Sequence, residues 1–148
     1  MNSELYSCMK QLTWKLVLPL TILSFVMITK SWYVAFVDGP HEVLKGFPYP
    51  YVCRGWHTSM SLQIYVLELV VDIFTYFIFW FLVVFSIHRF IVPIHISKIL
   101  FRSLLVLSGL ALIGVGFIFA DPNHIYKLHR KDEIVIEETG IHWIWEEE

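Results

Sequence analysis

The stretch that decides the fold is residues 60–87, MSLQIYVLELVVDIFTYFIFWFLVVFSI. Its only charged residues are Glu68 and Asp72. Its second half lacks the polar face, at 3.6-residue spacing, that a helix of a soluble protein would show. A bilayer core about 30 Å thick is crossed by about 20 mostly apolar helical residues. The stretch is therefore predicted to form a transmembrane helix.

Two further stretches are predicted to cross a membrane. Residues 99–120 contain the uncharged run SLLVLSGLALIGVGFIFA. Residues 14–37 are less uniform, because the uncharged run 16–29 is followed by Lys30 and then by apolar and aromatic residues. If only 16–29 were embedded, Lys15 and Lys30 would have to snorkel to the two interfaces. The sequence thus predicts an all-α integral membrane protein with three transmembrane helices.

The composition agrees with a membrane protein. Apolar residues make up 57% of the chain and charged residues 16%, against roughly 25% charged in an ordinary soluble domain. The net charge of −2 gives no global field that would recruit nucleic acid, so no nucleic-acid partner is expected. The chain is divided into a transmembrane domain, residues 1–120, and an acidic extramembrane tail, residues 121–148. In that tail, two segments rich in β-branched and aromatic residues flank Thr139-Gly140 and predict a small β-hairpin.

The basic residues predict an orientation. Lys and Arg in short segments close to the membrane mark the cytoplasmic side, and such residues cluster before the first span and around the 88–98 loop. We therefore expect a plasma-membrane protein with a cytoplasmic N-terminus, an inner loop at 88–98 and a C-terminus outside. The outer loop, 38–59, is rich in proline and aromatic residues, and we expect it to lie on the headgroup layer.

A polar stripe follows one face of the second predicted span. Successive helix residues are rotated by 100° about the helix axis. The polar side chains of this span, on Tyr65, Glu68, Asp72, Thr75 and Tyr76, therefore fall within an arc of roughly 100°. Asp72 lies near the middle of the predicted span, where an ionised carboxylate costs on the order of 3 kcal/mol or more. Lys30 and Glu68 are expected at the same depth, so we predict an ion pair between them and an unpaired, protonated Asp72. The candidate site residues are Lys30, Tyr65, Glu68, Asp72, Thr75 and Tyr76.

The third predicted span carries small residues on one face. Gly109 and Gly116 lie seven residues apart, and Ala120 follows four residues later. Small residues at such spacing let helix backbones approach closely. This face is therefore predicted to serve helix packing more than any chemistry.

Metal and cofactor motifs are sparse. Cys53 and His57 provide two neighbouring ligands, whereas a metal site needs three or four. The sequence has no phosphate loop, dinucleotide fingerprint, nucleophile elbow or zincin motif. We expect no metal, no haem and no other cofactor.

Three functions fit these residues. The one we favour is a non-enzymatic subunit or accessory protein of a membrane complex, whose polar stripe packs against a membrane-protein partner or a second copy. An alternative is a small proton- or ion-coupled transport component that uses Glu68 and Asp72. A second alternative is an enzyme acting on a lipid or quinone at the outer interface through His57. We expect the lipid bilayer to be a partner in each case.

Overall fold

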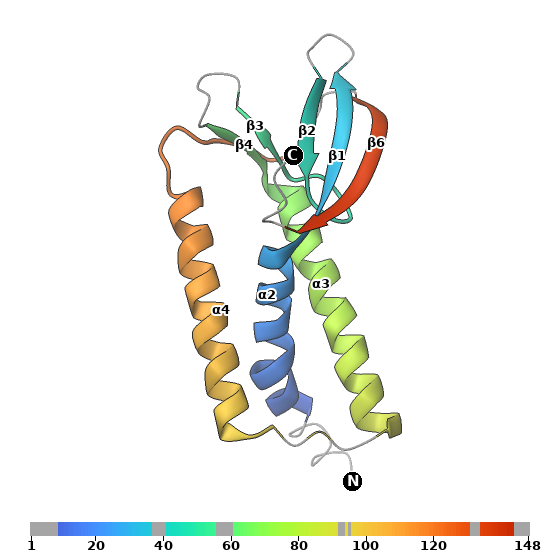
Figure 1. Cartoon of the computed structure of the whole chain (residues 1–148), viewed down its shortest axis with the longest axis vertical. Helices are drawn as coiled ribbons and strands as arrows, with labels where there is room; N and C mark the ends of the chain where they lie inside the picture. Colours follow the sequence, from blue (N-terminus) through green and yellow to red (C-terminus); the bar gives the residue numbers. More distant parts are fainter. Residues whose placement is uncertain are drawn as a thin grey trace.

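The protein is a mixed α/β structure and not the predicted all-α one. The computed structural model shows three helices side by side, with a β-sheet at one end of them (Figure 1). The described residues are 9–36, 41–55, 61–91, 94, 96–130 and 134–143.

The first helix is shorter than the predicted span at 14–37. From Met9, the first described residue, the backbone is helical; it passes through the π-helical turn η1 (Thr13–Val17) and ends as α2 (Leu18–Met27). At Ile28 the backbone becomes extended, with φ −114° and ψ 119°, and the chain continues directly into β1 (Ile28–Phe36). This strand, ITKSWYVAF, is rich in the β-branched and aromatic residues that favour sheets. The prediction of a transmembrane helix over 14–37 is therefore wrong.

Two helices of the described chain are long and apolar enough to cross a membrane. They are Val66–Ile91, formed by α3 (Val66–Ser86) and the π-helical turn η2 (Ile87–Ile91), and α4 (Lys98–Phe119). Ser97 caps α4, because its Oγ accepts the N–H of Leu100 at 3.2 Å. The helix predicted over 60–87 begins only at Val66, since the residues just before it form a strand.

The sheet has six strands in the order β5-β4-β3-β2-β1-β6. Its neighbours pair antiparallel, except β4 and β5, which are parallel. Residues expected in the outer loop and the tail thus join one sheet. The further strands are β2 (His41–Lys45), β3 (Val52–Arg54), β4 (Leu62–Tyr65), β5 (Ile125–Lys127) and β6 (Ile134–Trp143).

The predicted tail hairpin is wrong as well. Residues 134–143 form the single strand β6, which passes through Thr139 and Gly140 without turning. It pairs along the whole of β1, from Ile28↔Trp143 to Phe36↔Ile134. An isolated two-stranded hairpin is marginal in water, whereas β1 offers a long edge whose backbone groups need partners.

Helix α2 lies between α3 and α4 and packs against both (Figure 1). Val17 and Val84 are buried where the helices meet, away from the sheet. A second core lies in the sheet around Val34, Leu44 and Tyr65, with Trp32 packed against it. Because β4 runs directly into α3, the sheet and the helices meet at Tyr65 and Val66.

Candidate functional site at the junction of α3 and the sheet

The polar stripe lies on the buried face of α3. Tyr65 is the last residue of β4, and its side chain is fully buried. Glu68, Asp72 and Tyr76 follow on one helix face and are also buried, with Asp72 0% exposed. Thr75 lies at the edge of this face and donates its hydroxyl to the carbonyl of Val71 at 2.9 Å. Since α3 begins at Val66, Asp72 lies under two turns from the sheet and not near the middle of a span.

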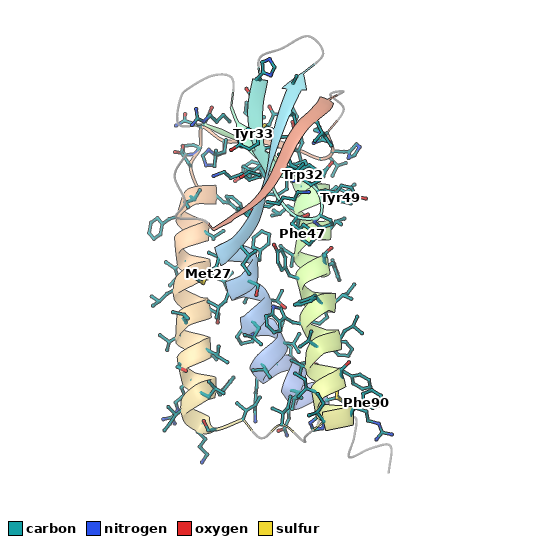
Figure 2. All side chains as sticks on the ribbon, turned by 45° about the vertical axis from the view of Figure 1, so that its right-hand side comes forward. Met27, Trp32, Tyr33, Phe47, Tyr49 and Phe90 are labelled. Atoms are coloured by element: carbon teal, nitrogen blue, oxygen red, sulfur yellow. The ribbon has the colours of Figure 1, made fainter. Side chains whose placement is uncertain are left out.

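Asp72 binds the loop that joins β2 to β3. Its Oδ2 accepts the backbone N–H of Phe47 at 2.5 Å, and its Oδ1 accepts that of Tyr49 at 3.2 Å. The prediction that Asp72 has no partner is therefore wrong. Phe47 and Tyr49 lie at the sheet end of α3 (Figure 2). We call residues 46–51, GFPYPY, the Asp72 loop.

Every backbone N–H of the Asp72 loop has an acceptor. Pro48 and Pro50 have no backbone N–H, so four donors remain in the loop, on Gly46, Phe47, Tyr49 and Tyr51. Asp72 accepts two of them, the carbonyl of Lys30 accepts that of Gly46 at 2.9 Å, and the carbonyl of Lys45 accepts that of Tyr51 at 3.0 Å. Backbone donors that leave water must find a partner, and here one carboxylate supplies two acceptors at once.

Gly46 permits the loop to turn. Its φ of +149° lies in the region that side chains disfavour, and a Cβ there would come within 2.2 Å of the Tyr49 carbonyl oxygen. The carbonyl of Gly46 accepts the indole N–H of Trp32 at 2.8 Å. The loop is thus fixed to β1 as well as to α3.

Tyr51 closes the loop against α2. Its ring stacks on Phe25 with centroids 5.5 Å apart, and its carbonyl accepts the N–H of Tyr65 at 2.8 Å. Burial raises the pKa of the Tyr51 phenol, and the nearby Asp72 carboxylate raises it further. The phenol therefore remains neutral at physiological pH.

Glu68 binds the segment that follows β5. Its Oε1 lies 2.7 Å from Nδ1 of His129 and accepts the backbone N–H of Arg130 at 3.2 Å. The N–H of Leu67 is donated to the carbonyl of Leu128 at 3.1 Å. The first turn of α3 therefore fixes residues 128–130, which follow β5.

The predicted ion pair between Lys30 and Glu68 is wrong. Lys30 belongs to strand β1 and not to a helix. Alternate residues of a strand share a face, so the side chains of Lys30 and Trp32 lie on the same side of the sheet. Its Nζ is 3.8 Å from the centroid of the Trp32 ring, a cation–π contact.

Two polar contacts on the same face of α3 were missed by the sequence analysis. The hydroxyl of Tyr76 donates to the carbonyl of Ile28 at 2.8 Å, at the point where α2 becomes β1. The indole of Trp80 donates to Oγ of Ser24 at 2.7 Å. Trp80 lies one turn after Tyr76, so its spacing was a signal that could have placed it on the stripe.

The predicted packing face of α4 is not used within the described chain. A Cβ added at Gly109 or Gly116 would meet nothing within 4 Å, and Ala120 is exposed. No helix of the described chain therefore approaches α4 closely at these glycines.

Within the residues that the structure describes, no group of three or more His, Cys, Asp or Glu side chains could hold a metal ion. Cys53 is buried beside Tyr65, with Sγ 4.0 Å from its hydroxyl oxygen. His57, the residue considered for interfacial catalysis, lies outside the described residues. No protein-family model, curated protein or solved structure matches this chain.

Proposed function

We propose that α3 and α4 cross a lipid bilayer and hold the six-stranded sheet at one membrane surface. The observation that carries this proposal is the apolar surface that the two helices leave uncovered. Large apolar side chains extend outward along both helices (Figure 2), whereas water-soluble monomers rarely expose apolar patches above a few hundred Å². Exposed examples are Leu67, Phe74, Ile78, Leu82, Leu107, Leu110, Ile113 and Phe117.

The helix lengths fit a bilayer. The 26 residues of Val66–Ile91 extend about 39 Å, and the 22 residues of α4 about 33 Å. Both exceed the hydrocarbon core of about 30 Å. Each helix therefore reaches from one interface to the other with little or no mismatch.

We infer that the sheet faces the outside of a plasma membrane. Arg89, Lys98 and Arg102 lie around the turn between α3 and α4, at the end away from the sheet. The first helical run, with Lys10 and Lys15 near its start, begins at the same end (Figure 1). Short basic segments favour the cytoplasmic side, and this orientation places β6, the last described strand, outside.

Within this frame, the chain is proposed to be a non-enzymatic accessory subunit of a membrane complex. The support is that the stripe carboxylates bind backbone N–H groups of the chain's own loops. Asp72 holds the Asp72 loop, and Glu68 holds the segment at Arg130. A carboxylate that moves ions along a path would face water or an open cavity, so these contacts favour a structural junction.

The experiment is purification from native membranes in a mild detergent. The tagged chain is isolated beside a tagged, unrelated membrane protein of similar abundance. We expect the chain to elute with a stoichiometric membrane partner that survives gel filtration and does not accompany the control protein. Elution of the chain alone, at the size of its own 17.5 kDa plus detergent, would contradict the proposal.

A further inference from the structure

A cavity of about 250 Å³ lies between the end of α2, the start of β1 and the middle of α3. It is bounded on the sheet side by Phe47 of the Asp72 loop, which lies at the sheet end of α3 (Figure 2). The other lining residues are Ser24, Ile28, Thr29, Lys30, Thr75, Tyr76, Phe79 and Trp80.

The cavity extends from the sheet side of α3 to about the middle of the helix. Thr75 and Trp80 lie about 14 Å and 21 Å along α3 from Val66, measured at 1.5 Å per residue. In a helix about 39 Å long, Thr75 belongs to the half nearer the sheet and Trp80 lies just past the midpoint. Lys30 lies on the sheet side of the cavity, two residues into β1.

Three polar side chains of the cavity wall already donate their hydrogen bonds within the chain. Trp80 donates to Ser24, Tyr76 donates to the carbonyl of Ile28, and the Thr75 hydroxyl donates within its own helix. A ligand that needed hydrogen bonds deep in the cavity, such as a quinone ring, would compete with these pairs. The wall therefore suits a hydrocarbon chain.

Among the described residues that line the cavity, Lys30 is the one with a charge. Among the described residues no carboxylate pairs with its ammonium group, which lies over the Trp32 ring. A cation at the headgroup end of an apolar cavity is complementary to a lipid phosphate.

We propose that this cavity binds an anionic phospholipid from the leaflet on the sheet side. One acyl chain occupies the cavity, and the phosphate lies at the ammonium of Lys30. The volume of about 250 Å³ is below the roughly 300–1,000 Å³ of drug-sized pockets, which suits part of a single chain. This proposal rests on the membrane placement of α3 proposed above.

Quenching of tryptophan fluorescence by brominated lipids tests it. The purified full chain is reconstituted in phosphatidylcholine vesicles that contain either phosphatidylglycerol or phosphatidylcholine with brominated acyl chains, at equal mole fraction. The signal of Trp80 is obtained by difference from a Trp80→Phe variant. We expect brominated phosphatidylglycerol to quench Trp80 at a mole fraction several-fold lower than brominated phosphatidylcholine does.

Substitutions test the headgroup contact and the acyl-chain cavity separately. Lys30→Gln is expected to abolish the preference for phosphatidylglycerol, Lys30→Arg to keep it, and Lys45→Gln on β2 to leave it unchanged. Thr75→Phe, which fills the cavity, is expected to reduce quenching by both lipids. If Thr75→Phe does not fold, as judged by circular dichroism, the Lys30 variants still decide the question.

Equal quenching of Trp80 by the two brominated lipids would overturn the proposal, as would an undiminished preference in Lys30→Gln. Vesicle flotation separates this failure from failure of the proposed membrane placement. If the protein floats with the vesicles but shows no lipid preference, only the lipid site is wrong. If the protein does not float, the membrane placement itself is wrong and the lipid site fails with it.

Discussion

The carboxylate of Asp72 accepts the backbone N–H of Phe47 at 2.5 Å, across 25 residues of chain. This contact joins the second turn of α3 to the loop between β2 and β3. Together with the bond from Tyr49, it makes one side chain of a helix the acceptor for a loop of the sheet. The helices and the sheet therefore depend on each other through Asp72, which can be tested by substitution.

We expect Asp72→Ala to lower the free energy of unfolding by about 2–6 kcal/mol, because two N–H donors lose a buried acceptor at about 1–3 kcal/mol each. Asp72→Asn retains one oxygen acceptor and should cost less. Chemical denaturation in detergent micelles measures both. The control is Asp121→Asn, at the turn after α4, where the carboxylate bonds to nearby Asn123 and to no other described residue. A loss for Asp72→Ala no larger than for the control would contradict the role of Asp72.

Gly46→Ala should destabilise the protein by about 1–3 kcal/mol or more, since an added Cβ clashes with the Tyr49 carbonyl at a strained φ of +149°. Gly116→Ala is the matched control, because a Cβ there meets nothing within 4 Å. The control should leave the melting temperature unchanged or slightly raise it. Equal effects of the two substitutions would show that the loop does not need glycine at position 46.

The two contacts of Glu68, with the Arg130 N–H and with His129, are expected to protect the neighbouring chain from protease to different extents. Glu68→Ala removes the acceptor for the Arg130 N–H as well as the pair with His129. His129→Ala removes only the pair, and the His129 side chain is 60% exposed, where such pairs are weak. We expect trypsin to cleave after Lys127 and Arg130 several-fold faster in Glu68→Ala, with a smaller change in His129→Ala. The reverse order of cleavage rates would refute this ranking.

Glu42 gives the sheet a pH dependence. Burial raises the pKa of this carboxyl above 4.5, and Arg54 offsets part of the effect. The folded state therefore holds the proton more tightly than the unfolded state does. The free energy of unfolding should fall as the pH rises from 4.5 through the higher folded pKa, and then level off.

Glu42→Gln tests this dependence. The variant should be more stable than the parent at pH 7, because the buried Oε2 of Glu42 has no hydrogen-bond partner among the described residues. Near pH 4, where the parent carboxyl is protonated, the two should converge. Thermal melts across this range measure the difference. A difference that stays constant with pH would exclude Glu42 as its source.

The sequence predicted some of this structure and missed the rest for physical reasons. Long apolar runs identify α3 and α4 because burial or lipid contact leaves no polar face. The change from helix α2 to strand β1 has no such signal in the sequence, since residues 20–36, which include the junction of Met27 and Ile28, contain no Gly or Pro. What makes residues 28–36 a strand is pairing with β2 and β6, which lie elsewhere in the chain.

The sequence likewise predicted only part of the candidate site. Helical spacing alone brings Glu68, Asp72 and Tyr76 to one face of α3. Their partners depend on tertiary contacts, because the Arg130 N–H that Glu68 accepts lies 62 residues away. Lys30 was paired with Glu68 only because it was assumed to be helical.

The most direct test of the central proposal, that α3 and α4 cross the membrane and hold the sheet on its outer side, is labelling of single cysteines. Lys45→Cys on β2 and Lys98→Cys at the start of α4 are made with Cys8 and Cys53 replaced by serine. Both positions are exposed and lie at opposite ends of the helices. A membrane-impermeant maleimide should label Lys45→Cys in intact cells and label Lys98→Cys only after permeabilisation. Labelling of both positions from the same side would contradict the account.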